Sequence, residues 1–176
     1  ETYTRSFGPI LGLIGRDVDS ANTTLNVTLK PGLNSPAYTL GHNITISADH
    51  LRNDPLDTIG VFIHEYTHVL QDYKGKGREW FTEGSADYTR YKLNPSDRWA
   101  KFCRAHISYG NPFGGYWASA AFLMYLEDHY KKPIVSEVSS AVIKGVYQDS
   151  IWKKLTGKDL DTLAADYKTS HWTPRK

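Results

Sequence analysis

Residues 63–68 read Ile-His-Glu-Tyr-Thr-His, a His-Glu-x-x-His motif inside an apolar run. Residues four apart on a helix lie roughly 40° apart about its axis, so His64 and His68 can direct both imidazoles toward one point. Imidazole nitrogens bind zinc at about 2.0–2.1 Å. Glu65 lies about 100° further round, where it can act on a water at the metal without being a ligand. The motif therefore predicts a zinc (Zn2+) site with Glu65 as general base.

Two other interpretations of these residues, a structural histidine pair and a zinc-thiolate cluster, are less favourable. A structural pair of buried histidines would leave a carboxylate buried beside them, which is costly without a partner. A zinc-thiolate cluster has no ligands, because Cys103 is the only cysteine, and an intramolecular disulfide is excluded for the same reason. The neighbours of Cys103 suggest a helix on the core, so we expect this thiol to be buried and inert.

A third zinc ligand is expected from the segment that follows, since a catalytic zinc takes three protein ligands plus water. Residues 78–93 form a plausible second helix, with Glu83 and Asp87 four apart on one face. We favour Glu83 as the ligand over Asp87, because Asp87 can then accept the outer N–H of a ligand histidine. The elongated zincin motif needs glycine and histidine where the chain has Gln71 and Lys74, so that class is excluded.

A hydrogen-bond donor opposite the metal would stabilise the tetrahedral intermediate of hydrolysis. Residues 111–115 form a turn-rich loop directly before a strongly helical segment that begins at Tyr116. Tyr116 is our candidate for this donor and His106 is a lesser one. The alternative is that Tyr116 only packs.

The motif segments His64-Glu-Tyr-Thr-His-Val-Leu-Gln71 and Trp80-Phe-Thr-Glu-Gly-Ser-Ala-Asp-Tyr-Thr-Arg90 resemble the basic secretory protein family of plants, fungi and bacteria. That family looks like a gluzincin-like branch of the zinc metallopeptidases. The resemblance is specific across residues 43–130 and extends into the tail. It implies zinc ligands His64, His68 and Glu83, with Glu65 as base and Asp87 as the acid behind the ligands. The Gly114-Gly-Tyr116 helix start resembles the place where related peptidases put their transition-state tyrosine.

The segments around the motif predict the elements that position it. Residues 24–30 alternate apolar and polar side chains, which predicts a half-buried strand with Val27 and Leu29 on the inner face. Residues 43–47 predict a second strand. Our hypothesis is that it is an edge strand that lines the cleft and pairs with an extended peptide, the alternative being an ordinary sheet strand. Residues 1–20 have no clean period and predict a short strand or loop.

The motif helix is expected to begin at Asp54 and Pro55, to run to about Tyr73 and to be stopped by residues 75–77. Its apolar character nearly all round implies burial. Later helices are expected over residues 78–93, 97–109, 116–127, 135–144 and 150–156, with a last one opened by residues 159–161. We therefore predict an α+β fold. It is a zincin-like single domain over residues 1–176, with a small N-terminal mixed or antiparallel sheet packed on the metal-site helix and a mainly helical C-terminal half.

Composition limits the partners. The net charge of +2 and the absence of long Lys/Arg clusters argue against nucleic-acid binding, and no apolar run of 18 residues exists that could span a membrane. Sequons at Asn22, Asn26 and Asn43 are compatible with secretion. We expect a monomer that acts on a peptide or protein substrate. The resemblance implies a secreted protein, or a periplasmic one in a bacterium.

The sequence thus favours a zinc-dependent endopeptidase in which Glu65 serves as general base for hydrolysis. The alternative is a secreted, metal-stabilised defence or carbohydrate-surface binding protein with little or no turnover. Chelation discriminates between them, since only a peptidase loses and regains proteolysis with the metal.

Overall fold

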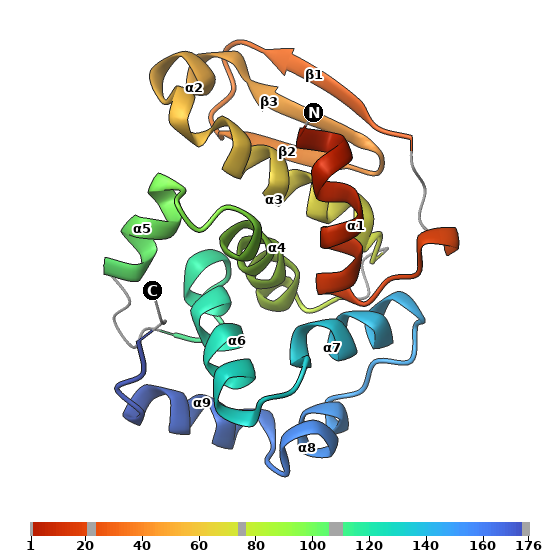
Figure 1. Cartoon of the computed structure of the whole chain (residues 1–176), viewed down its shortest axis with the longest axis vertical. Coiled ribbons are helices and arrows are strands. Elements are labelled where there is room, and N and C mark those ends of the chain that lie inside the picture. The colour runs from red at the N-terminus through yellow and green to blue at the C-terminus, as the bar shows by residue number, and fades with distance from the viewer. Residues whose placement is uncertain (1, 21–23, 74–76, 106–110, 174–176) are drawn as a thin grey trace.

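A small sheet lies at one end of the molecule, and helices build the rest (Figure 1). This computed structural model describes residues 2–20, 24–73, 77–105 and 111–173. The strands are β1 (Asn26–Lys30), β2 (Ala37–Leu40) and β3 (Asn43–Ser47). The helices are α1 (Thr2–Ile14), α2 (Ala48–Asn53), α3 (Thr58–Gln71), α4 (Glu79–Leu93), α5 (Arg98–Ala105), α6 (Tyr116–Tyr130), α7 (Ile134–Ile143), α8 (Ser150–Thr156) and α9 (Leu160–Thr169), with the short 3-10 helices η1 (Val18–Ser20) and η2 (Pro55–Asp57). The predicted α+β fold, with an N-terminal sheet and a helical C-terminal half, is confirmed.

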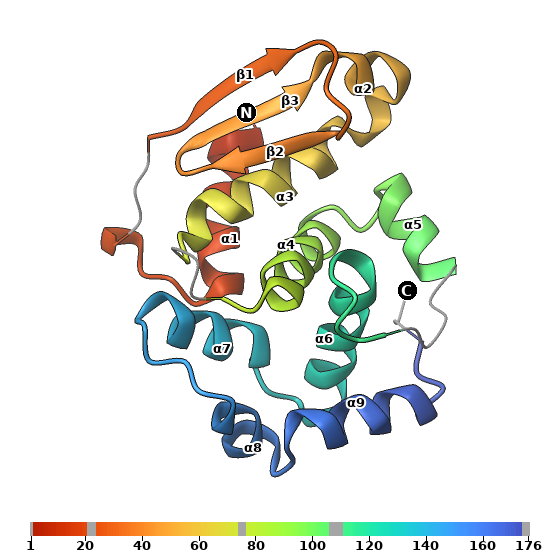
Figure 2. The ribbon, with the colours of Figure 1, turned by 180° about the vertical axis from the view of Figure 1, so that it is seen from behind.

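The elements follow one another from the sheet toward the opposite end in the order sheet, α3, α4, α6 and α9, as the front and back views agree (Figure 1, Figure 2). Helix α4 therefore lies between the motif helix and the C-terminal helices. Its approach to α6 is close, because Gly84 has no side chain and a Cβ atom there would lie 2.5 Å from the Cβ of Ser119. No helix among the described residues is long and apolar enough to cross a membrane.

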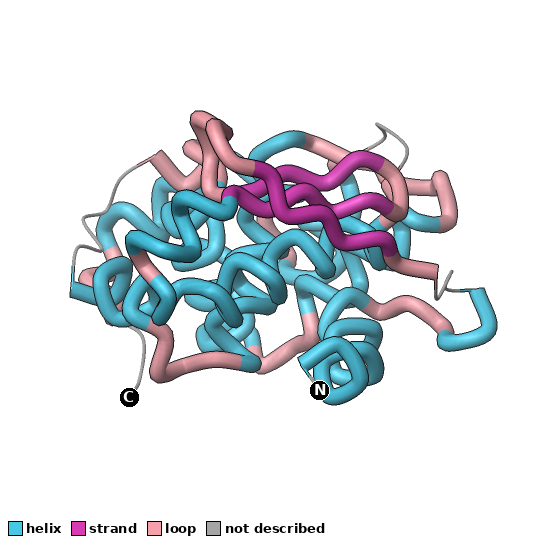
Figure 3. The backbone as a smooth tube through the Cα atoms, turned by 90° about the horizontal axis from the view of Figure 1, so that it is seen from above, coloured by secondary structure: helices cyan, strands magenta, loops and turns pink. Residues whose placement is uncertain are grey.

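The three-stranded sheet is mixed, with strand order β1-β3-β2 (Figure 1), and its strands lie side by side (Figure 3). Strand β1 runs parallel to β3, and β2 runs antiparallel to it. Strand β3 occupies the middle of the sheet, and its Ile44 and Ile46 side chains are buried. The hypothesis that residues 43–47 form a peptide-binding edge strand is therefore wrong. Strands β1 and β2 form the two edges, and β2 is the edge that lines the cleft.

Strand β1 exists as predicted, but it is exposed along its whole length and not half buried. Val27 and Leu29 pair with Ile44 and Ile46 and so share their face, yet they are 48% and 60% exposed. Cross-strand neighbours point to the same side of a sheet, so the alternating pattern correctly gave the face. It failed on burial because the sheet extends at β1 beyond the side chains that cover β3.

The first segment is helix α1 and not the short strand or loop that its glycines and Pro9 suggested. Ile10, Leu11 and Ile14 are buried, and the helix packs against α3 and α7. Tertiary packing of this apolar stripe outweighs the low helix propensity of glycine and proline.

The motif helix α3 is buried nearly all round, as its sequence indicated. Its boundaries differ from the prediction. Pro55 begins a separate 3-10 turn, and α3 starts at Thr58. It ends at Gln71, because Asp72 adopts the left-handed conformation with φ 41°, before the predicted stop at residues 75–77 is reached.

The later helices agree with the sequence pattern, and their aromatic side chains form the larger of two cores. Buried rings of this core include Trp80, Phe81, Phe122, Trp152 and Tyr167. Gly157 ends α8 with φ 83°, and the side chain of Asp159 caps α9. Helix α5 is described to Ala105, so His106 and the side chain of Cys103 lie outside the described part of the chain.

Candidate metal centre and active site

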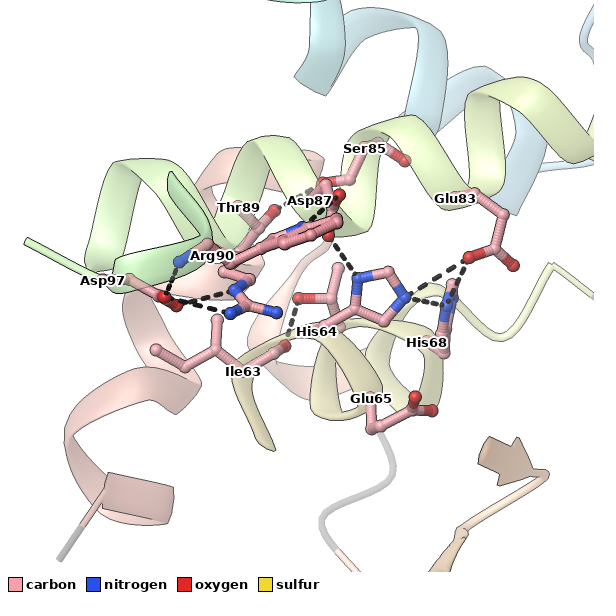
Figure 4. A network of polar contacts seen from close by, with 12 residues as sticks. Ile63, His64, Glu65, His68, Glu83, Ser85, Asp87, Thr89, Arg90 and Asp97 are labelled. Carbon is pink, nitrogen blue, oxygen red and sulfur yellow. Dashed lines mark hydrogen bonds and ion pairs between the residues drawn. The ribbon is translucent and has the colours of Figure 1, made fainter. Parts of the chain in front are cut away.

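Three side chains from two helices converge on one point. His64 and His68 lie one turn apart on α3, with their Nε2 atoms 3.0 Å apart. Glu83 of α4 directs Oε2 to the same place, 3.3 Å from Nε2 of His64 and 3.4 Å from Nε2 of His68 (Figure 4). The structure therefore brings together the three residues that the sequence suggested as ligands, and they form a group that could hold a metal ion.

The outer ring nitrogens decide which atoms remain for a metal. Nδ1 of His64 lies 2.8 Å from Oδ1 of Asp87, and Nδ1 of His68 lies 2.8 Å from Oε1 of Gln71. Both partners are hydrogen-bond acceptors, so each Nδ1 carries a proton, and the neutral form of each ring presents its lone pair on Nε2. Two lone pairs and a carboxylate oxygen facing one another fit a cation and suit zinc.

Gln71 is the functional residue that sequence reasoning missed on this helix. Its Nε2 donates to Oγ of Ser85 at 2.8 Å and to the carbonyl of Thr82 at 3.2 Å, which fixes the amide so that Oε1 faces His68. The signal was present, since Gln71 lies three residues after His68 and shares its helix face.

Asp87 is buried behind His64 and belongs to a wider polar network. Its Oδ2 accepts from the indole nitrogen of Trp99 at 3.4 Å. Next along α4, Arg90 donates to Asp97 through Nε at 2.7 Å and also pairs with Asp57. These ion pairs lie where α4 and the start of α3 meet, so the two ligand-bearing helices are joined by charge as well as by packing.

The charges of the site reinforce one another. Burial lowers the pKa of His64, but hydrogen bonds to Asp87 and Glu83 outweigh burial and raise it to about 10. Burial raises the pKa of Glu83, but hydrogen bonds from His64 and His68 outweigh burial and lower it to about 2. Without a metal, this cluster therefore favours a positive charge at its centre, in the form of a proton on His64.

Glu65 points away from the three converging side chains, toward the sheet (Figure 4). Its Oε2 accepts a hydrogen bond of 2.7 Å from Oγ1 of Thr39 in β2. The carboxylate thus lies at the cleft beside the metal group without joining it, as a proton acceptor requires. No spacing in the sequence relates Thr39 to Glu65, so this partner could not be predicted.

Tyr116 is the first residue of α6 and has the left-handed φ of 44° directly after Gly115, which has φ 78°. Its ring stacks on that of His64, with centroids 6.0 Å apart and planes 13° apart, and the side chain is 53% exposed. The negative charge of Glu83, and then burial, raise the pKa of the Tyr116 phenol. The hydroxyl therefore stays protonated at neutral pH and can donate a hydrogen bond at the mouth of the site.

A cleft of about 1100 Å³ is lined by His64, Glu65, His68, Glu83 and Tyr116. Its other side is lined by residues 35–41, which include β2. The amide of Ser47 donates to the carbonyl of Pro36, so this pair is hydrogen-bonded across β2 and β3. In an antiparallel ladder such pairs alternate, so Ala37 and Thr39 turn their N–H and C=O groups away from β3. The cleft therefore has a strand edge along one wall whose backbone groups at Ala37 and Thr39 point away from β3, and the Ala37 carbonyl accepts a hydrogen bond of 3.3 Å from Oγ of Ser35.

A carboxylate, a group that could hold a metal ion and a strand edge line one cleft, and this arrangement fits the class of hydrolases that act on peptides. A family model described as a peptidase of plants and bacteria, BSP, matches residues 15–167. The chain therefore belongs to this peptidase family, and the resemblance to the basic secretory proteins is confirmed at the level of the family. Searches of curated proteins and of solved structures give no match.

Proposed function

We propose that the protein is a zinc-dependent endopeptidase of the gluzincin type. The observation that carries this proposal is the convergence of His64, His68 and Glu83 on one point, with both outer imidazole nitrogens bound to acceptors. When bound there, zinc supplies Lewis acidity that polarises a peptide carbonyl and lowers the pKa of water to about 7. The gluzincin type follows from a glutamate as third ligand.

Glu65 is the proposed general base. Its carboxylate borders the metal group and is oriented by Thr39, so it can take a proton from the attacking water and return it to the leaving amine nitrogen. Tyr116 is the proposed donor to the carbonyl oxygen as negative charge develops there. Its protonated phenol and its place beside His64 support this role.

The free edge of β2 supports a peptide as substrate. An extended chain can pair with the outward N–H and C=O groups of Thr39 and with the N–H of Ala37, in the manner of an added strand, while the Ala37 carbonyl accepts from Oγ of Ser35. Backbone pairing needs no chain terminus, which favours cleavage within a chain. We further propose that the protein is secreted and acts as a monomer, with secretion resting on the family resemblance.

Chelation and one variant test the proposal. We expect 1,10-phenanthroline to abolish casein hydrolysis and added zinc to restore it, measured as release of soluble peptides. His64→Ala should lose both bound zinc and proteolysis, because it removes a ligand. His129→Ala, an exposed histidine on α6, is the matched control and should keep both. A zinc-loaded protein that binds the metal but cleaves nothing would favour the metal-stabilised binding protein instead.

A further inference from the structure

Thr39 joins the edge strand of the cleft to the proposed base. We propose that the Thr39 hydroxyl positions the carboxylate of Glu65 for proton transfer, an inference that rests on the proposed peptidase function. The Thr39 hydroxyl contacts Glu65, whereas the group that could hold a metal is formed by His64, His68 and Glu83. Thr39 is therefore a positioning residue, acting through Glu65.

The hydrogen bonds of the Thr39 hydroxyl can fix the conformation of the Glu65 side chain. Oγ1 of Thr39 lies 2.7 Å from Oε2 of Glu65 and 3.1 Å from the backbone carbonyl of the same residue. Both distances lie within hydrogen-bond range, and because the hydroxyl has one proton for two acceptors, the contacts form one three-centre bridge in which the carboxylate is the nearer acceptor. A glutamate has several rotatable bonds, and this bridge selects one of its conformations.

The selected conformation keeps two carboxylates apart. Glu83 turns its carboxylate toward the Nε2 atoms of the two histidines, whereas Glu65 turns its own toward β2 (Figure 4). Glu65 is a direct chain neighbour of His64, so a different side-chain conformation would bring a second carboxylate toward the metal group. The hydroxyl of Thr39 keeps the Glu65 carboxylate beside the cluster of His64, His68 and Glu83 and prevents it from becoming a fourth ligand.

Thr39 also presents its own backbone to the cleft. Its N–H and C=O point away from β3, as the hydrogen bond between Ser47 and Pro36 requires for this register. A peptide that pairs with the free edge of β2 would therefore bond to the backbone of the residue whose side chain holds the base. Substrate docking and base alignment depend on one residue, which places the scissile bond at a fixed distance from Glu65.

The test compares Thr39→Val, which keeps the shape but removes the hydroxyl, with Thr39→Ser, which keeps the hydroxyl. For zinc-loaded protein and a peptide substrate, we expect Thr39→Val to lower kcat by roughly 10- to 100-fold, the range typical of residues that orient a reactive side chain. KM should change by less than about twofold, because the backbone of β2 is unaltered. Thr39→Ser should recover most of kcat, and the zinc content should be equal in all three proteins.

The matched control is Thr28→Val, the same substitution at an exposed position of β1 in the same sheet, which should leave kcat unchanged. Full activity in Thr39→Val, or a Thr39→Ser protein as impaired as Thr39→Val, would overturn the inference while the peptidase function stands. A double-mutant cycle with Glu65→Ala adds a readout that needs no activity. The shift in Tm of the double variant should be smaller than the sum of the two single shifts.

The double-mutant cycle distinguishes failure of the inference about Thr39 from failure of the proposed peptidase function. Additive shifts in Tm would show that Thr39 and Glu65 do not interact, and this overturns the inference whether or not the protein cleaves peptides. A zinc-loaded wild-type protein without proteolysis overturns the proposed function instead, and the catalytic consequence assigned to Thr39 falls with it.

Discussion

The two walls of the cleft differ in the chemistry that they contribute. The wall formed by β2 offers backbone groups and the uncharged hydroxyl of Thr39, which holds Glu65. The opposite wall, formed by α4 and α6, offers Glu83, Asp87 and Tyr116, which surround the imidazoles with negative charge and an aromatic ring. The comparison teaches that the residues suited to hold a metal and those suited to move a proton are placed on different sides of α3.

The packing behind the two walls differs as well. The sheet rests on a small core of mostly aliphatic side chains, and its outer strand β1 is exposed. Helix α4 is buried along most of its length and lies against the larger, aromatic core of the C-terminal helices. The wall that carries Glu83 is therefore backed by the larger core, whereas the strand edge of β2 belongs to the sheet on the smaller core.

The largest effect is expected from Glu65→Gln, on the sheet side. The amide keeps the size of the side chain and an acceptor for Thr39 but cannot take up a proton. Proteolysis should fall by roughly 10²- to 10⁴-fold, the usual contribution of a general base, while zinc content stays the same. Activity on a fluorogenic peptide and metal analysis of the same sample measure both. Glu137→Gln, an exposed acid on α7, serves as the control. Loss of zinc from Glu65→Gln would break the division between the walls.

An intermediate effect is expected from Asp87→Asn, on the helix side. Asparagine still accepts from Nδ1 of His64, but the negative charge behind that ring is removed, so His64 gains a neutral amide partner like that of His68. Zinc affinity should fall roughly 10-fold, at the lower end of what such outer partners contribute, and excess zinc should restore activity.

Competition with a chromophoric chelator measures this affinity. Asp161→Asn, at an exposed position in the first turn of α9, removes the same charge far from the cleft and should bind zinc like the wild type. If Asp87→Asn instead lowered turnover at saturating zinc, the helix side would share in the chemical step. The division of roles between the two walls would then be wrong.

The smallest effect is expected in the pH dependence of stability of zinc-free protein. The pKa of His64 rises from 6.5 to about 10 on folding, so its contribution is complete below pH 6.5 and is lost as pH rises toward 10. The pKa of Glu83 falls from 4.5 to about 2, so its contribution is complete above pH 4.5 and is lost as pH falls toward 2. The two together should stabilise the chelated protein most between pH 4.5 and 6.5.

Denaturant midpoints of chelated wild type and Glu83→Gln, measured across this pH range, isolate the contribution of the cluster. The difference between the two proteins should be greatest in the window and shrink on either side. A difference independent of pH would mean that the imidazoles and the carboxylate do not interact in the metal-free protein.

The candidate site was largely accessible from sequence because its residues are related by helical spacing. His64 and His68 share one face of α3, Glu83 and Asp87 share one face of α4, and the structure brings both faces together. Thr39 was out of reach, because its relation to Glu65 depends on which strand forms the sheet edge. Strand order is decided by tertiary packing, and alternation within a segment carries no information about it.

The fold shows the same boundary between local and tertiary information. Helices with capping residues, such as α9 behind Asp159, were predicted closely. The glycines and proline of α1 concealed a helix that exists because its apolar stripe is covered by α3 and α7. The exposure of β1 is the converse case, since an alternating strand pattern cannot tell whether anything packs against it.

The missing side chain at Gly84 allows the close approach of α4 and α6. Any larger residue would meet Ser119 and the main chain that follows it, and would push the two helices apart. At the start of α6, a Cβ atom built on Gly115 would lie 3.8 Å from the Cβ of Glu83, so a shift of α6 would also change the position of the Tyr116 ring that stacks on His64. The absence of a side chain at Gly84, directly next to Glu83 in the chain, thus sets the spacing between α4 and the helix that begins at Tyr116.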